Sequence, residues 1–233
     1  MSSDETTLGT SFSRPARQER SQQSFNRLLD AAFALVSETG STAVTLADVV
    51  KRAGVSTGVV YSRVKSKDDL LRALLTREMD LMDAEAERTL NSYVSVQANF
   101  PGFVVRMVEL LVEHLRVTAE RTRVAIQIGY ADPVAAAIGH ASYQRTERLF
   151  TARLLERRDD ITHEDPELAA ARAFVIVYSV VARHLGLHGE RVTSPLWEWN
   201  ELIEDLSTMV MHYLWGNDAG AGALAVHRSR EGR

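Results

Sequence analysis

The residues best suited to chemistry lie together in one short polar segment, from Thr57 to Lys67. Its candidate contact residues are Thr57, Gly58, Tyr61, Ser62, Arg63, Lys65 and Lys67. Hydroxyl and guanidinium groups form hydrogen bonds both with phosphate oxygens and with the edges of bases. Ser66 and Asp69 form a capping pattern, so Lys67 stands at a helix start, where a cation and free backbone N–H groups suit a phosphate. The segment therefore favours binding to a nucleic acid.

Two short helices joined by a tight turn would position these groups. Thr45 opens a capping pattern, and the helix that it begins runs to about Ala53. Gly54 supplies the backbone freedom that a turn needs, and Ser56 caps a next helix over about residues 57–64. This is a helix-turn-helix pattern, in which the second helix enters the major groove of DNA.

A preceding helix completes a predicted three-helix unit over residues 21–70. Apolar residues recur at helical spacing from Phe25 to Val36, which predicts a helix over about Gln22–Glu38. Residues 1–20 show no periodicity and are expected to be a flexible basic arm. Its arginines, Arg14, Arg17 and Arg20, either stay solvated or enter an adjacent minor groove.

The charge distribution agrees with this division. The net charge is −4, yet residues 14–67 hold nine basic and four acidic residues, which leaves 18 basic against 27 acidic ones elsewhere. A basic N-terminal third on an acidic body is typical of one polyanion-binding unit carried by a second module.

The remainder of the chain reads as helical throughout, so an all-α protein of about nine helices is expected. Residues 71–215 form the predicted second domain, and residues 216–233 a flexible tail. The longest apolar run, Ala173–Ala182, has about half the length needed to cross a bilayer. The N-terminus lacks the apolar core of a secretory signal, so a cytoplasmic protein without membrane contact is expected.

The sequence resembles the tetracycline-repressor (TetR) family of one-component transcriptional regulators. The resemblance rests on F-x-x-L-L-D-A-A-F (25–33), T-L-A-D-V-V-K-R-A-G-V-S (45–56) and G-V-V-Y-S-R-V-K-S-K-D-D-L-L (58–71). It implies that Tyr61, Lys67 and Thr45 contact the DNA backbone. By the same resemblance Thr57, Gly58 and Arg63 approach bases. Arg63 suits a phosphate about equally well, and Tyr61 would otherwise simply cover the domain surface.

The resemblance also implies that the C-terminal helices bind a small molecule and dimerise through the last two long helices. The dimer would read an operator with two half-sites on double-stranded DNA. Polar or aromatic groups in apolar helices are the candidate ligand contacts: His114, Gln127, Tyr143, Tyr178 and Trp197. Each is otherwise a core or interface residue. The mixed aromatic and aliphatic surroundings favour an apolar or aromatic effector.

Catalytic motifs are not found, so no enzyme activity and no cofactor are expected. His184 and His188 have the spacing of a metal pair, but Gly186 between them indicates the end of a helix, so no metal site is expected. The expected function is a repressor released from its operator by an effector. An activator, an effector-independent regulator, and an enzyme or carrier with a vestigial helix-turn-helix are the alternatives.

Overall fold

The structure is a computed structural model that describes residues 13–61, 63–93, 99–187 and 197–215. Within these ranges it contains nine α-helices, one short 3-10 helix and no strand, which confirms the all-α prediction. The N-terminal helices are α1 (Ser13–Thr39), α2 (Leu46–Ala53) and α3 (Thr57–Tyr61). They are followed by α4 (Lys67–Leu90), α5 (Phe100–Val117), α6 (Ala119–Ala131), α7 (Pro133–Leu155), η1 (Arg158–Asp160), α8 (Pro166–His184) and α9 (Trp199–Trp215).

The helix α2 begins and ends where the sequence predicts, because both of its caps are formed locally. The Thr45 hydroxyl accepts the backbone N–H of Asp48 at 3.1 Å, and the Asp48 carboxylate accepts the backbone N–H of Thr45 at 3.2 Å. At the other end Gly54 has a φ of 60°, the left-handed conformation that glycine adopts without strain, and its N–H donates to the Val50 carbonyl at 3.1 Å.

The helix α1 is longer than predicted. It begins at Ser13, so residues 13–20 are helical and are not the flexible arm expected there, whereas residues 1–12 lie outside the described ones. Alanine, arginine, glutamine and glutamate, which fill positions 16–20, are strong helix formers. Pro15 falls in the first turn, where a missing N–H costs nothing.

The helix α3 is shorter than the predicted range of about residues 57–64. The helix α3 ends at Tyr61, and the N–H groups of Arg63 and Val64 both donate to the Val60 carbonyl in a tight turn. The helix α9 begins at Trp199, because the Glu198 backbone N–H donates to the Glu201 carboxylate, as at a helix start. The predicted tail, residues 216–233, lies outside the described residues.

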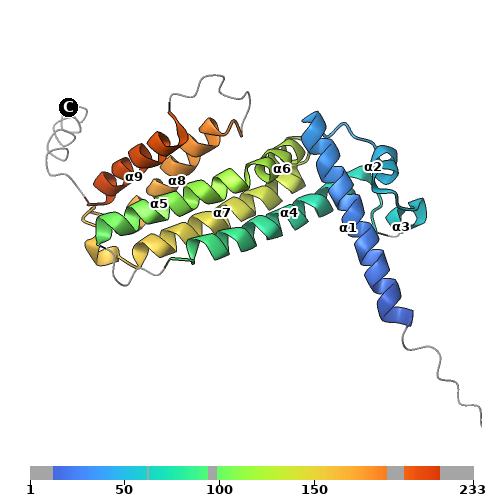
Figure 1. Ribbon diagram of the computed structural model, residues 1–233, viewed down its shortest axis with the longest axis horizontal. Helices are drawn as coiled ribbons and strands as arrows, with labels where there is room; N and C mark the ends of the chain where they lie inside the picture. The colour runs from blue at the N-terminus through green and yellow to red at the C-terminus, as the bar shows by residue number, and fades with distance from the viewer. Residues whose placement is uncertain (1–12, 62, 94–98, 188–196, 216–233) are drawn as a thin grey trace, which may run out of the picture.

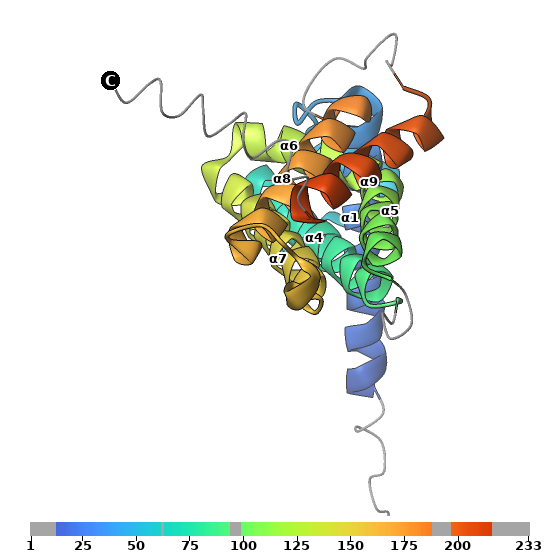
Figure 2. The same ribbon diagram turned by 90° about the vertical axis from the view of Figure 1, so that its left-hand side faces the viewer.

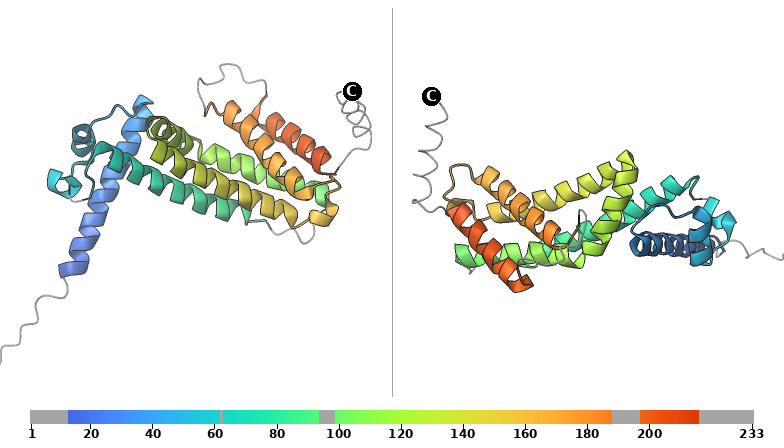
Figure 3. Two further views of the ribbon diagram at one scale, coloured as in Figure 1. Left: turned by 180° about the vertical axis from the view of Figure 1, so that it is seen from behind. Right: turned by 90° about the horizontal axis from the view of Figure 1, so that it is seen from above.

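The elongated molecule has the helix-turn-helix at one end and a helical bundle at the other (Figure 1). The helices α4, α5 and α7 run lengthwise, α4 packs chiefly on α7, and α8 and α9 cover one side of the bundle (Figure 2). The helix α6 lies where the bundle meets α1 (Figure 3). No helix among the described residues is long and apolar enough to cross a membrane.

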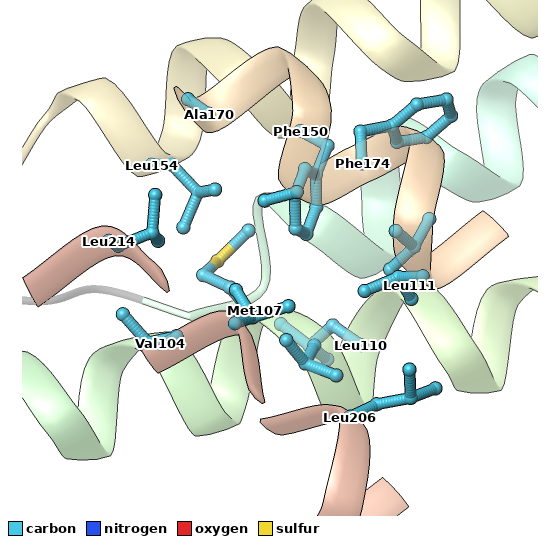
Figure 4. Close-up of a cluster of buried hydrophobic side chains, with 14 of the residues drawn as sticks. Val104, Met107, Leu110, Leu111, Phe150, Leu154, Ala170, Phe174, Leu206 and Leu214 are labelled. Atoms are coloured by element: carbon cyan, nitrogen blue, oxygen red, sulfur yellow. The ribbon is translucent and has the colours of Figure 1, made fainter. Parts of the chain in front are cut away.

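Two large hydrophobic clusters and a small third one hold the fold together. The C-terminal cluster joins α5, α7, α8 and α9 around fully buried side chains such as Met107, Phe150 and Phe174 (Figure 4). The N-terminal cluster joins α1, α2, α3 and α4 and also takes in Val124 and Ile128 of α6. The domain boundary predicted at residues 70 and 71 therefore lies inside one continuous helix, α4, and one continuous core.

Candidate nucleic-acid interface and ligand cavity

The surface formed by α2, α3 and the turn after α3 carries most of the predicted nucleic-acid contacts. Thr45, Ser56, Thr57, Gly58, Arg63 and Lys65 are all exposed, and Lys67 is half-buried. Tyr61 is 66% exposed, which is unusual for so large a side chain, whereas Val60 behind it is fully buried. Ser62 lies outside the described residues. The helix α3 is thus fixed to the core by one face and open to a partner on the other.

Two of the predicted phosphate contacts also hold the unit together. The Thr45 hydroxyl is engaged with Asp48, as described above, and the Lys67 ammonium donates to the Thr42 carbonyl at 3.0 Å. Lys67 therefore ties the start of α4 to the segment before α2. An ammonium has three N–H donors, so two remain for a phosphate at this surface.

Arg63 lies differently from its predicted outward position. Its guanidinium donates to Gln22 Oε1 at 3.3 Å and to Ser21 Oγ at 3.2 Å, and it lies 5.5 Å from the centre of the Phe25 ring. A guanidinium over an aromatic face is electrostatically attracted to it. In this structure Arg63 is therefore held along α1, and its contact with a base remains a prediction.

A cavity of about 400 Å³ opens between the helices of the C-terminal part. Three of the five predicted ligand contacts line it, namely His114 of α5, Tyr143 of α7 and Tyr178 of α8. The other lining residues come from α4, α5, α6 and α7: Met79, Met82, Leu115, Thr122, Ala125, Ile126, Gly129, Tyr130, Ala135, Ala136, Gly139, His140, Ser142 and Thr146. Such a volume falls in the range of small-molecule sites.

The predicted ligand contacts Gln127 and Trp197 do not line this cavity. Gln127 is exposed on α6, on a different side from the cavity-lining Ala125 and Ile126. The Trp197 indole N–H donates to the Asp205 carboxylate at 2.8 Å, and its ring packs on the C-terminal cluster. The sequence does not separate them from the lining residues, because polarity in an apolar segment does not reveal which way a helix face points.

The cavity offers polar groups but no carboxylate, ammonium or guanidinium. Its lining contains no Asp, Glu, Lys or Arg. His114 is only 2% exposed, and burial lowers the pKa of its imidazole to about 4, against the weaker opposite effect of Glu85 and Asp83. Burial likewise raises the pKa of the Tyr178 phenol. These groups are therefore neutral near pH 7 and offer hydrogen bonds without charge.

An ion-pair network crosses the junction between the cavity and the helix-turn-helix. Arg77 of α4 pairs with Asp30 of α1 and with its neighbour Glu78, both at 2.7 Å. Glu78 is 2% exposed and also accepts from Arg121 of α6. The helices α1, α4 and α6 are thus fastened to one another beside Met79, which belongs to the cavity lining.

The family model of the "Bacterial regulatory proteins, tetR family" matches residues 28–74, the same stretch that builds the helix-turn-helix and the start of α4. The HTH-type transcriptional regulator AcrR of Shigella flexneri is 32% identical over 121 residues, which are 50% of this chain and 52% of AcrR. The helix-turn-helix part of the chain, residues 28–74, is therefore of the TetR-family type.

One further relative and one solved structure are also similar to this chain. The HTH-type transcriptional repressor KstR of Mycolicibacterium smegmatis is 36% identical over 84 residues, 36% of this chain and 37% of KstR. The chain thus spans about half or less of the length of these two relatives. A solved TetR-family structure from Mesorhizobium loti covers 84% of this chain and 96% of its own, with a TM-score of 0.64 at 18% identity, which shows a shared fold.

Several residues of the cavity lining were not predicted from the sequence. Among them are Ala135, Gly139, Ser142 and Thr146 of α7, which recur at helical spacing as one stripe of small side chains. That stripe is a readable signal, since small residues on one helix face leave room beside it. Met79 and Met82 carry no such signal, because methionine also fills ordinary cores.

Proposed function

We propose that this chain is a TetR-family transcriptional regulator that binds operator DNA as a homodimer and is released when a small molecule fills the cavity. One observation carries the proposal. The helix α3 presents Thr57, Gly58 and Tyr61 to the outside while Val60 anchors it to the core. The relatives' names, transcriptional regulator and transcriptional repressor, support the same function.

In the proposed complex α3 lies in the major groove. Tyr61, Lys67 and Thr45 contact backbone phosphates, and Thr57 and Gly58 face base edges. Ser56, Ser62, Arg63 and Lys65 are the further candidate contacts on this surface. The Lys65 side chain makes no ion pair within the described residues, so its charge is free for a phosphate.

The proposed dimer forms through α8 and α9. Leu168, Val175 and Ile176 of α8 are 40–43% exposed, and their spacing places them on one face of the helix. Met209 and Trp215 of α9 are 51% and 49% exposed. Apolar side chains gathered on two neighbouring helices are typical of a surface that a second copy covers. Two copies supply the two recognition helices, one for each half-site of the operator.

Release would follow from the position of the cavity. It is lined by α4, α6 and α7, and both α4 and α6 pack on α1 of the helix-turn-helix unit. A ligand that fits one arrangement of these helices better than another shifts the population toward that arrangement. If the favoured arrangement spaces the two copies of α3 wrongly for the operator, DNA affinity falls.

The test measures binding of the full chain to labelled DNA from upstream of its own gene, by fluorescence anisotropy at low and high salt. We expect a dimer on two half-sites and a steep loss of affinity with salt, since several phosphates are neutralised. Binding that is equally tight on unrelated DNA, or an asymmetric single site occupied by a monomer, would contradict the proposal.

A further inference from the structure

We propose that the cavity takes an uncharged, ring-containing molecule with one polar group such as a hydroxyl, and that His114 recognises that group. The inference rests on the proposed function only for the role of this molecule as an effector.

The absence of charge in the cavity lining excludes ionic ligands. A carboxylate or an ammonium that enters an apolar cavity without an oppositely charged partner loses far more hydration energy than a neutral molecule does. Two carboxylates of α4, Asp83 and Glu85, act electrostatically on His114. Both are already paired: Asp83 accepts the Ser142 hydroxyl and Arg145 Nε, each at 2.5 Å, and Glu85 accepts Arg88 and the Thr89 hydroxyl. Neither is therefore available to pair with a cationic ligand.

His114 is a buried polar group without a protein partner. Its Nδ1 is completely buried and unpaired, and Nε2 has no hydrogen-bond partner among the described residues either. A buried polar atom left unpaired is destabilising, so groups of this kind are normally satisfied by protein, water or ligand. A neutral imidazole has one donor and one acceptor nitrogen, and a hydroxyl, which both donates and accepts, can pair with whichever of the two it reaches.

The remaining walls suit a ring. Tyr143 and Tyr178 meet edge to face with ring centroids 4.8 Å apart, and Tyr143 also packs against Phe174 at 5.3 Å. Met79 and Met82 face the same cavity from α4, and thioethers pack well against aromatic rings. Flat apolar walls with few polar groups favour a rigid ring system over a flexible charged chain.

The experiment compares four probes of one shape and different charge: naphthalene, 2-naphthol, 2-naphthoate and 2-naphthyltrimethylammonium. Their dissociation constants for the full chain are measured by equilibrium dialysis at pH 7. We expect 2-naphthol to bind about tenfold more tightly than naphthalene and than either ion.

Three variants test whether His114 causes the preference for 2-naphthol and whether the probes bind in the cavity. His114→Phe should bind naphthalene as the native chain does and lose the preference for 2-naphthol. His212→Phe is the matched control, because His212 is an exposed histidine of α9 that does not line the cavity, and its loss should leave the preference unchanged. Gly139→Leu should weaken every probe, since a side chain added at Gly139 meets no atom within 4 Å and extends into free space.

The outcomes separate the two proposals. Equal or tighter binding of an ionic probe, a His114→Phe variant that keeps the preference, a control that loses it, or no binding of any probe would each overturn the inference. Operator binding is measured on the same preparations. A chain that prefers 2-naphthol through His114 but binds no operator would contradict the regulatory function alone.

Discussion

The two sites of this molecule are built in opposite ways. The nucleic-acid surface is made of residues 45–67, close together in the chain and mostly exposed. The cavity is lined by residues from Met79 to Tyr178, on five helices, and its buried imidazole, that of His114, has no partner among the described residues. The first surface is assembled by local capping and a turn, the second by packing.

This difference determines how substitutions in each site affect folding and binding. Substitutions on the exposed surface of α3 remove contacts with a partner and leave the core intact. Substitutions in the cavity act on groups that already bear a cost of burial, so they change folding and ligand selection together. The junction at Glu78, where α1, α4 and α6 are paired, is where the two kinds of site meet.

The largest effect is expected on the proposed dimer surface. Ile176→Asp would bury an unpaired carboxylate between two copies, which costs about 3 kcal/mol or more, so the dimer dissociation constant should rise about a hundredfold. Sedimentation equilibrium measures it. Leu81→Asp is the control, because Leu81 is similarly exposed, at 48% against 40%, but lies on α4. An unchanged dimer in Ile176→Asp would place the interface elsewhere.

The cavity should make stability depend on pH. In the unfolded chain the His114 imidazole titrates near 6.5, whereas in the folded protein its pKa is about 4. Between these values the unfolded state binds a proton that the folded state does not, so stability falls as pH drops from 6.5 to 4. The loss is at most about 3 kcal/mol. Urea unfolding of the native chain and of His114→Phe measures the difference, and identical pH profiles would refute it.

On the nucleic-acid surface Tyr61→Ala should cost about 1–3 kcal/mol of operator binding, a loss of affinity of about fivefold to 150-fold, with no change in thermal stability. Tyr61 is exposed, so its removal leaves no cavity behind. Tyr61→Phe isolates the contribution of the hydroxyl. Full affinity in Tyr61→Ala would show that α3 docks by another face.

The smallest effect is expected at Gly58. Gly58 lies in α3 with ordinary backbone angles, and a side chain added there meets no atom within 4 Å. Gly58→Ala should therefore raise the free energy of unfolding by up to about 1 kcal/mol, since alanine is the better helix former. Operator affinity should nevertheless fall if α3 approaches DNA closely. Anisotropy and thermal unfolding on one preparation test both signs together.

Consecutive residues are enough to predict the elements whose ends are made locally. The capping pattern at Thr45 and the glycine at position 54 predict α2 and its turn because their partners lie within four residues. The apolar spacing around α3 likewise predicts which side faces the core. Local hydrogen bonds and helical periodicity both depend on residues that are close in the chain, so the helix-turn-helix follows from the sequence alone.

Contacts between distant residues settle the rest, and these arise only in the tertiary structure. They hold Arg63 along the unexpectedly long α1, and they bring His114, Tyr143 and Tyr178 to the cavity while leaving Gln127 and Trp197 out. The rotation of a helix about its own axis is fixed by the helices packed against it. Which polar side chains share a cavity is therefore a property of packing, and no pattern of neighbouring residues determines it.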